Sequence, residues 1–396
     1  MLAGRQRIQF GPDSSGANIC INGRNCRPES IIRPYLGKKM PVRNGWLRTV
    51  APSDFNSTGF DLFALFGCNR RCLHCLLHKT QLSNMTSMSL RLVELIIEWA
   101  TSSGSPFQEA TLLGGEFALH QQAKEVVKLL GRSRCASGKP MRVRIVTNGS
   151  APFRRLLRDC EVVRILQNGC VNVSLEHADP TINDRIRGPR AHQDALAAVS
   201  LLRKLQIPFA INTTVCKLNA HGLAELFAWA EHSGAFRVNI HWWTPAGNGR
   251  ERLPYEQLSP VGWREVIRAA TAFVPTGPGF VVDCQQGFVY DDIPLANPGA
   301  CAIRDRTNLQ FYPPETPDSL ECRASSCGMM ADYAVDGGYI FGPGGLRDIV
   351  QLPRGVGTPE NARHRTDCGQ CPLSDYFTPS RANWPMVCIY HRVGDP

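Results

Sequence analysis

Three cysteines in one short loop are the residues of this chain best suited to chemistry. Cys68, Cys72 and Cys75 follow an apolar run at Cys-x3-Cys-x2-Cys spacing, in the stretch Gly67-Cys68-Asn69-Arg70-Arg71-Cys72-Leu73-His74-Cys75. Thiolates this close together can bind three irons of a cubane cluster and leave the fourth iron open. An open iron can bind a substrate or cofactor and pass it an electron. The loop therefore indicates catalysis.

Chance, structural zinc and disulfides each account less well for the cysteine loop. With 16 cysteines among 396 residues, the spacing arises by chance with odds of roughly 0.03 per chain. A structural zinc site is the stronger alternative, but such sites usually close with a fourth Cys or His, and the candidates His74 and His78 crowd the same loop. A disulfide framework is favoured less than zinc, because it belongs to an oxidising compartment.

The composition is that of an ordinary soluble protein, 43% hydrophobic and 20% charged. No apolar run approaches the roughly 18 residues that span a bilayer, and the start of the chain lacks an apolar secretion core. We therefore expect a cytoplasmic protein with no membrane contact, whose scattered Cys135, Cys160 and Cys170 are small buried hydrophobic residues. The net charge of +10 is spread in short groups, which favours a solvated basic surface.

Strand-like and helix-like segments alternate from about residue 57 to 243, as in a parallel sheet with crossover helices. The predicted strands are Phe60–Phe66, Ala110–Leu113, Arg142–Thr147, Val171–Glu176, Phe209–Val215 and Phe236–Trp242. The predicted helices are Leu90–Ala100, Gln121–Leu130, Phe153–Asp159, Asp194–Leu205, Leu223–Glu231 and Pro260–Ala272.

Several predicted strands alternate polar and apolar residues, whereas parallel strands buried on both faces are apolar throughout. In Val171-Asn172-Val173-Ser174-Leu175-Glu176 the polar residues fall on one face. A sheet curled into a barrel, with helices outside and a polar interior that holds a ligand at the carboxyl ends of the strands, accounts for this. Six strands predict an α/β fold with a partial, TIM-like (β/α)6 barrel.

The end of the chain has a different character. Six cysteines fall in the last 96 residues, among many Gly and Pro. A loop-rich segment with so many thiols is expected to be held together by metal. We therefore divide the chain into an N-terminal extension at 1–56, a core barrel at 57–285 and a small cysteine-rich domain at 286–396.

Together these residues resemble the radical S-adenosylmethionine (radical SAM) superfamily, over roughly 57 to 250. The resemblance implies that Cys68, Cys72 and Cys75 hold a 4Fe-4S cluster whose open iron chelates the methionyl amino and carboxylate groups of S-adenosylmethionine. It also implies that reduction of the cluster cleaves the cofactor to a 5'-deoxyadenosyl radical, which takes a hydrogen atom from the substrate.

Further residues match the cofactor site of that superfamily. Gly114-Gly115-Glu116 is similar to its Gly-Gly-Glu motif, in which glycines allow close backbone approach and the carboxylate contacts the methionyl ammonium. The resemblance also implies hydrogen bonds to the ribose and a salt link to the cofactor carboxylate. The residues at these positions are Ser174 and Glu176 for the ribose, Arg187 for the carboxylate, and Asn148 and Asn212 as further pocket residues.

The cysteine-rich end resembles the SPASM or twitch auxiliary cluster domains of that superfamily. The candidate ligands are Cys322, Cys327, Cys368, Cys371 and Cys388, around a hairpin-like stretch from Tyr333 to Phe341. A full SPASM domain has seven cysteines, including one after the hairpin and a further close pair, which this chain lacks. One auxiliary cluster is therefore favoured over two, with its ligands left open.

The resemblance implies a radical enzyme acting on a peptide or other small polar substrate, supplied with electrons by a donor such as flavodoxin or ferredoxin. A carbohydrate dehydrogenase or epimerase is an alternative within the superfamily. A non-catalytic metal-binding module on nucleic acid is an alternative of another class, but no surface of interleaved aromatic and basic residues is legible. The substrate, the fate of the radical and the oligomeric state are left open.

Cys216 is a candidate catalytic residue. It shares strand parity with Asn212 and Thr214, so we expect it inside the barrel, where a thiol can return a hydrogen atom to a substrate radical. A small core cysteine is the simpler interpretation.

Overall fold

The structure is a computed structural model. It describes residues 49–55, 57–243, 247–249, 256, 258, 260–284, 308–325 and 338–350, together with short strands at 8–10, 19–21, 24–26, 288–289 and 387–388.

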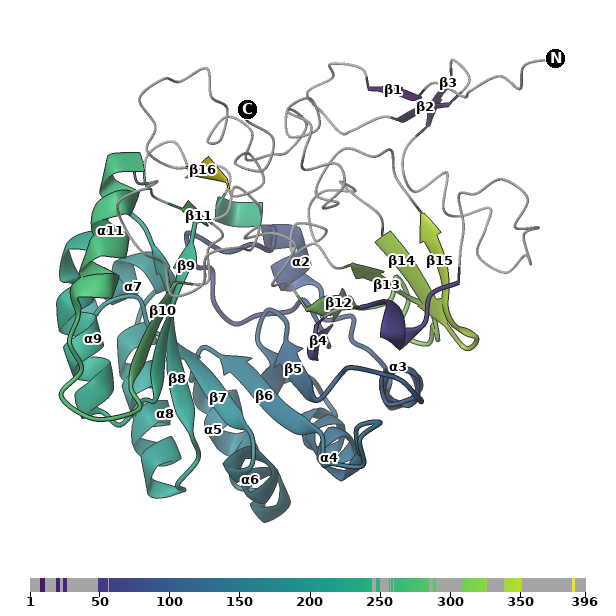
Figure 1. The fold of residues 1–396 in the computed structure, drawn as a ribbon, viewed down its shortest axis with the longest axis horizontal. Helices are drawn as coiled ribbons and strands as arrows, with labels where there is room; N and C mark the ends of the chain where they lie inside the picture. Colours follow the sequence, from purple (N-terminus) through teal and green to yellow (C-terminus); the bar gives the residue numbers. More distant parts are fainter. Residues whose placement is uncertain are drawn as a thin grey trace.

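Six parallel strands form the centre of one large sheet, and they neighbour one another in chain order. They are β4 (Gly59–Phe63), β5 (Glu109–Leu113), β6 (Arg142–Thr147), β7 (Cys170–Ser174), β8 (Phe209–Val215) and β9 (Arg237–Trp242). β10 (Val281–Cys284) adds a further parallel strand beyond β9. The sheet curves with helices on its outside (Figure 1), which confirms the predicted α/β partial barrel.

The outer helices follow the strands in the expected order. They are α3 (Leu90–Ala100), α4 (Ala123–Arg132), α5 (Ala151–Leu156), α6 (Cys160–Gln167), α7 (Pro180–Arg187), α8 (Ala191–Lys204), α9 (Leu223–His232) and α11 (Pro260–Ala272), while the short α2 (Lys79–Ser83) follows the cysteine loop. The bounds of α3, α11, β6 and β8 agree with the prediction.

The local structure differs from the prediction around α5 to α7 and at the end of β7. The helix expected at Phe153–Asp159 ends at Leu156, as α5. A separate helix that was not predicted, α6, follows it, because the Asp159 carboxylate accepts hydrogen bonds from the backbone N–H groups of Glu161 and Val162. Helix α7 was not predicted, although Asp179 caps it and Pro180 occupies its first position. Glu176, predicted as the last residue of a strand, lies two residues beyond the end of β7.

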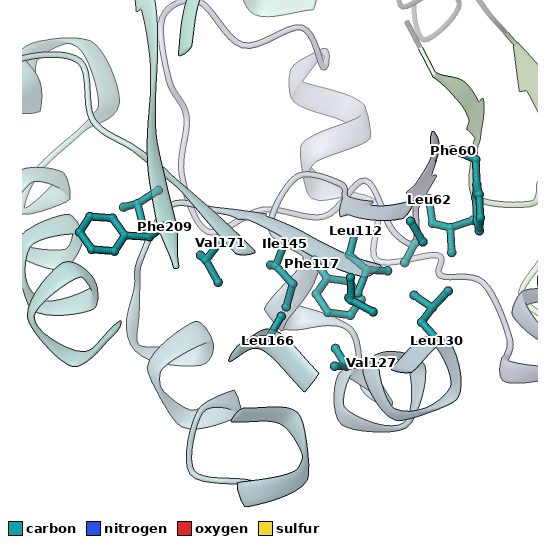
Figure 2. Packing of buried hydrophobic residues seen from close by; sticks show 14 of the residues in the cluster. Phe60, Leu62, Leu112, Phe117, Val127, Leu130, Ile145, Leu166, Val171 and Phe209 are labelled. Atoms are coloured by element: carbon teal, nitrogen blue, oxygen red, sulfur yellow. The ribbon is translucent and has the colours of Figure 1, made fainter. Parts of the chain in front are cut away.

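The two faces of the sheet differ in chemistry. Outward side chains such as Leu112, Ile145 and Val171 are fully buried and pack against helix residues that include Val127 and Leu166 (Figure 2). Inward positions are polar: the Asn239 amide donates to the Asn212 carbonyl oxygen on the neighbouring strand, at 2.8 Å. Val146, Asn212 and Thr214 keep partial exposure, so solvent reaches the inner face, whose polar character agrees with the prediction.

Strands from the C-terminal part continue the same sheet. β12 (Leu309–Phe311) runs parallel to β4, and the antiparallel β13 (Cys322–Ser325), β14 (Gly338–Gly342) and β15 (Gly345–Val350) follow it. Trp99 of α3 packs edge-on against Phe311 and Phe341, with ring centroids 6.0 and 6.2 Å away. The division of the chain near residue 285 stays a prediction.

In the part of the chain that the structure describes, two smaller sheets are not hydrogen-bonded to this one. β1 (Ile8–Phe10), β2 (Ile19–Ile21) and β3 (Arg24–Cys26) form an antiparallel sheet within the predicted N-terminal extension. β11 (Phe288–Val289) pairs with β16 (Val387–Cys388). Within the described residues, no helix is both long and apolar enough to cross a membrane.

Candidate functional site

The cysteine loop crosses the carboxyl end of the sheet between β4 and α2. Its backbone is fixed from three sides: the N–H of Cys68 donates to the carbonyl of Leu82, the N–H of Leu73 donates to the carbonyl of Ile186, and the carbonyl of Gly67 accepts from the N–H of Glu116. These bonds tie the loop to α2, to the end of α7 and to the turn after β5. The sequence places the thiols in one loop, and long-range pairing fixes where that loop lies.

The two glycines of the Gly114-Gly115-Glu116 turn make room for the cysteine loop. A Cβ atom on Gly115 would lie 2.2 Å from the carbonyl oxygen of Phe66 and 2.6 Å from the Cβ of Cys68, and one on Gly114 would lie 2.3 Å from the carbonyl oxygen of Leu65. The loop backbone thus requires glycine here independently of any bound ligand.

The three cysteines of this loop are free thiols. Cys72 is buried, with its Sγ 3.8 Å from the carbonyl oxygen of Arg187, while Cys68 accepts a hydrogen bond from the backbone N–H of Arg70 at 3.3 Å. Burial raises the pKa of Cys68 to about 11 and that of Cys75 to about 12. These thiols therefore need a metal's positive charge to become thiolates at neutral pH.

Each candidate for a fourth zinc ligand makes another contact through one of its two ring nitrogens. His74 lies with its Nε2 3.4 Å from Glu176 Oε1. The His78 ring caps α2, where it accepts from the backbone N–H of Thr80. Within the described residues, no three His, Cys, Asp or Glu side chains converge on one ion position. A cluster, in which each thiolate binds a different iron, suits the three cysteines better than a single zinc ion.

Glu176 and Arg187 form a buried ion pair beside the thiols. Arg187 Nη1 donates to Glu176 Oε1 at 2.6 Å, and Glu176 Oε2 accepts from the Thr213 hydroxyl at 3.2 Å and from the Thr214 backbone N–H at 2.6 Å. Arg187 Nε is buried with no hydrogen-bond partner among the residues that the structure describes. The guanidinium is therefore fixed by Glu176 and keeps a buried N–H for another acceptor.

The His74 ring lies beside the ion pair of Glu176 and Arg187, with its Nε2 next to the Glu176 carboxylate. Burial lowers the pKa of His74 to about 4, so the ring is neutral at physiological pH. Because a carboxylate only accepts, Nε2 carries the proton toward Glu176, and the buried Nδ1 is an acceptor that no described residue contacts by a hydrogen bond.

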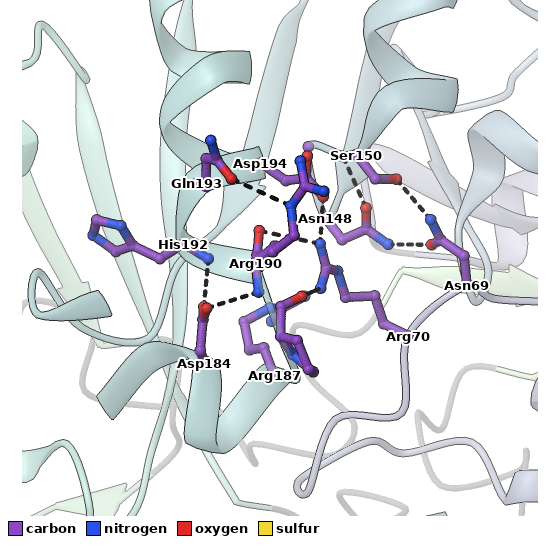
Figure 3. Close-up of polar contacts among 12 residues, drawn as sticks. Asn69, Arg70, Asn148, Ser150, Asp184, Arg187, Arg190, His192, Gln193 and Asp194 are labelled. Carbon is purple, nitrogen blue, oxygen red and sulfur yellow. Dashed lines mark hydrogen bonds and ion pairs between the residues drawn. The ribbon is translucent and has the colours of Figure 1, made fainter. Parts of the chain in front are cut away.

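Glu116 links the ends of β5 and β6. Its buried carboxylate accepts from the Thr147 hydroxyl at 2.9 Å and from the Asn148 backbone N–H at 2.8 Å, and burial raises its pKa. The Asn148 amide donates to the Asn69 side-chain oxygen at 2.8 Å (Figure 3) and lies 4.0 Å from Cys68 Sγ. Glu116 and Asn148 therefore lie together at the cysteine loop, and their predicted contacts with a cofactor stay predictions.

Residues 64–230 match the Radical SAM superfamily. The chain contains a radical SAM domain. Its resemblance to that superfamily is thereby confirmed, and with it the cofactors that the superfamily implies, a 4Fe-4S cluster and S-adenosylmethionine.

Curated relatives match about half of this chain. An AdoMet-dependent heme synthase of Methanosarcina barkeri is 29% identical over 202 residues, which make up 51% of this chain and 54% of that protein. An AdoMet-dependent heme synthase of Nitratidesulfovibrio vulgaris is 25% identical over 203 residues, 50% of this chain and 52% of that protein. The match thus spans about half the length of these relatives.

Among solved structures, native anSMEcpe with bound AdoMet and Cp18Cys peptide superimposes with a TM-score of 0.53 at 14% identity, over 82% of this chain and 86% of that chain. This likeness shows a shared fold.

The residues of the radical SAM domain fit its cofactors on chemical grounds. Three thiols on one loop suit three irons, and the buried Nε–H of Arg187 suits a carboxylate. Ser174, at the end of β7, and Asn212 of β8 occupy opposed inner positions and are both partly exposed. The individual cofactor contacts of these side chains stay predictions.

Cys216 lies one residue beyond β8 and is fully buried in a small apolar cluster with Ile186 and Trp243. Burial raises the pKa of its thiol to about 12. The surroundings are those of a core cysteine, and the role of Cys216 as a hydrogen donor stays a prediction.

The auxiliary ligands are placed only in part. Cys322 on β13 is buried in the main hydrophobic core, opposite Phe341 of β14. Cys327, Cys368 and Cys371 lie outside the described residues, as does the side chain of Cys388 in β16.

Sequence reasoning missed the polar residues that support the site. Arg70 and Asp194 form an ion pair, and Thr213 and Thr214 hold Glu176. The consecutive arginines Arg70 and Arg71, placed between two cysteines, were an available signal of a charged contact.

Proposed function

We propose that this protein is a radical SAM enzyme that reductively cleaves S-adenosylmethionine and abstracts a hydrogen atom from a peptide or other small polar substrate. The observation that supports this most strongly is the meeting of the three-thiol loop with Arg187 and Glu176 at the carboxyl edge of a polar, partly exposed inner face.

The chain's own residues bind and orient in this proposal. When bound, the cluster and S-adenosylmethionine supply a carbon radical that abstracts hydrogen. Arg187, fixed by Glu176, pairs with the cofactor carboxylate, and Glu116 pairs with its ammonium. Ser174 and Glu176 hydrogen-bond the ribose hydroxyls of the cofactor, and Asn212, partly exposed like Ser174, lines its pocket.

The domains and the electron supply belong to the same proposal. Residues 57–285 form the core barrel, and 286–396 carry one auxiliary iron–sulfur cluster for electron transfer or substrate binding. The candidate ligands are Cys322, Cys327, Cys368, Cys371 and Cys388, and the packing of Cys322 in the hydrophobic core favours the other four. An external donor such as flavodoxin or ferredoxin supplies the electron in the cytoplasm.

The substrate has two candidates with specific support. The solved structure of similar fold holds a Cp18Cys peptide, which favours a peptide. The curated relatives are AdoMet-dependent heme synthases, which favours the substrate of those enzymes. Because substrates are read by parts of a fold that vary most, neither likeness decides between them.

The test is cofactor cleavage by anaerobically reconstituted protein. With dithionite and S-adenosylmethionine, wild type is expected to form 5'-deoxyadenosine, detected by mass spectrometry, and a variant with Cys68, Cys72 and Cys75 changed to Ala is not. The matched control changes three different cysteines, Cys135, Cys160 and Cys170, to Ala and retains cleavage. Wild type that binds zinc, or iron without cleavage, would instead indicate a non-catalytic metal-binding module.

Deuterium-labelled peptide and the labelled substrate of the heme synthases then separate the two candidates. The true substrate transfers deuterium into 5'-deoxyadenosine, and the other does not.

A further inference from the structure

Arg70 ties the cysteine loop to the turn between α7 and α8. Its Nη1 donates to the carbonyl of Pro189 at 2.7 Å, and its Nη2 donates to the carbonyl of Arg190 at 3.4 Å and to the Asp194 carboxylate at 2.5 Å (Figure 3). Only 9% of the Arg70 side chain is exposed. Arg70 stands between Cys68 and Cys72, so its position and theirs are coupled through a single loop.

The acceptors of Arg70 are themselves held in place. The turn at 188–190 has positive φ at Gly188 (97°) and at Arg190 (61°), the latter unfavourable for a residue with a side chain. The Asp184 carboxylate offsets this by accepting from the backbone N–H groups of Arg190 and His192, both at 2.7 Å. The turn can therefore present the Pro189 and Arg190 carbonyls at a fixed position.

Asp194 also links Arg70 to the end of strand β6, through Arg154. Its second oxygen pairs with Arg154 Nη1 at 3.0 Å, and the same nitrogen donates to the carbonyl of Gly149 at 2.7 Å. Gly149 directly follows Asn148, which contacts the cysteine loop through Asn69. Arg70, Asp194 and Arg154 thus complete a ring of polar contacts, which we call the Arg70 brace, from the loop through α8 to the end of β6 and back.

We propose that the Arg70 brace positions the cysteine loop for its cluster and sets the balance of charge beside it. Arg70 and Asp194 are positioning residues, because they act through the loop rather than by touching cofactor or substrate. The proposal rests on the proposed function in one respect, namely that the three cysteines hold a redox-active cluster.

The sign of the charge effect follows from elementary electrostatics. A cluster becomes more negative on reduction, so a nearby positive charge raises its reduction potential and a nearby negative charge lowers it. Arg70 and Asp194 carry opposite charges within one largely buried pair. Removing the charge of Arg70 therefore lowers the potential, and removing the charge of Asp194 raises it.

The experiment measures two properties of the reconstituted full-length protein: the midpoint potential of the cluster whose signal is absent from the Cys68/Cys72/Cys75 triple variant, and the rate of iron release to a chelator. Arg70→Gln is expected to lower the potential and Asp194→Asn to raise it. Each is expected to release iron roughly tenfold faster, as is typical when a residue supporting a ligand is lost.

Two further variants keep the test decisive. Arg70→Lys retains the charge but loses the fork, so its potential stays near that of wild type while its iron is released faster. Arg132→Gln removes an arginine from another ion pair, with Glu161 on the outer helices, and should change neither property. If Arg70→Gln does not fold, Asp194→Asn and Arg70→Lys carry the comparison.

The outcomes separate the two proposals. Wild type without a cluster at the three cysteines would overturn the proposed function. A cluster in wild type, with potentials that shift in the same direction or not at all in Arg70→Gln and Asp194→Asn, would overturn the brace and leave the proposed function standing.

Discussion

Gly115 lies so close to the cysteine loop that adding one methyl group there should displace the loop. A single methyl group would meet the backbone oxygen of Phe66 at 2.2 Å and that of Gly67 at 2.5 Å. Because backbone atoms cannot move aside as a side-chain tip can, Gly115→Ala should displace the cysteine loop and cost roughly 1–3 kcal/mol of stability. Chemical denaturation and iron content after reconstitution measure both effects.

Gly138→Ala is the matched control. Gly138 has φ of 79°, but a Cβ there has nothing within 4 Å, so the change costs backbone strain of about 1 kcal/mol and leaves iron content unchanged. Equal iron content in Gly115→Ala and Gly138→Ala would show that the cysteine loop does not depend on this close approach.

His120 predicts a pH dependence of stability. Burial lowers its pKa, with the ring hydrogen-bonded to the Met88 carbonyl at 2.9 Å and to the Gln122 N–H at 3.0 Å. The ring therefore takes up a proton at lower pH in the fold than in the unfolded chain, where its pKa is about 6.5. The unfolded chain binds the extra proton, so stability falls as pH drops below about 6.5. Thermal unfolding of His120→Gln from pH 7.5 to 5 should fall less steeply than wild type, and parallel curves would contradict this.

Helix α7 is the element on which the cofactor site depends most. It presents the Ile186 carbonyl to the cysteine loop and carries Arg187, and Asp179 caps its start by accepting from the Thr181 N–H at 2.6 Å. Asp179→Ala should lower the melting temperature and also weaken S-adenosylmethionine binding several-fold, because loss of the cap loosens the helix. Calorimetric titration of reconstituted protein measures the binding.

The cap of α6 provides the comparison. Asp159→Ala removes an equivalent N-cap from a helix that carries no site residue, so it should lower the melting temperature without weakening the binding. If both variants bind S-adenosylmethionine as wild type does, α7 does not position Arg187 in the way inferred.

The position of Cys322 on strand β13 predicts that this cysteine does not bind iron. It places Cys322 in the main core beside Phe341, so Cys322→Ala should retain all of the protein's iron and lose roughly 1 kcal/mol of stability for the missing sulfur contacts. Loss of iron in this variant, measured against Cys170→Ala as a second buried cysteine, would make Cys322 a ligand after all.

Among the helices and strands, hydrophobic periodicity predicts the long elements well, whereas the helix-capping residues identify short helices that periodicity misses. The alternation in β8 and the apolar spacing of α3 predict those elements to the residue, because their side chains face one sheet and one core. α6 and α7 are short helices set by Asp-initiated caps, a weaker local signal. The ion pair of Arg70 with Asp194 joins residues 124 apart, a pairing decided by the packing of α7 and α8 that one sequence does not reveal.

The whole molecule divides its chemistry between the two faces of one sheet. The outer face is apolar and covered by helices, and the inner face is polar and reached by solvent, with the cysteine loop at its carboxyl edge. Strands β12 to β15 extend the sheet at the β4 edge. The described strands of the C-terminal part thus join the sheet beside the strand that leads into the cysteine loop.

The central claim is that the three cysteines hold a cluster with one open iron that binds S-adenosylmethionine. Its most direct test is the electron paramagnetic resonance spectrum of dithionite-reduced protein, recorded before and after S-adenosylmethionine is added, with the Cys68/Cys72/Cys75 triple variant as background. We expect a cluster signal, absent from the variant, whose shape changes on addition of the cofactor. A signal that the cofactor leaves unchanged, or one that persists in the variant, would contradict the claim.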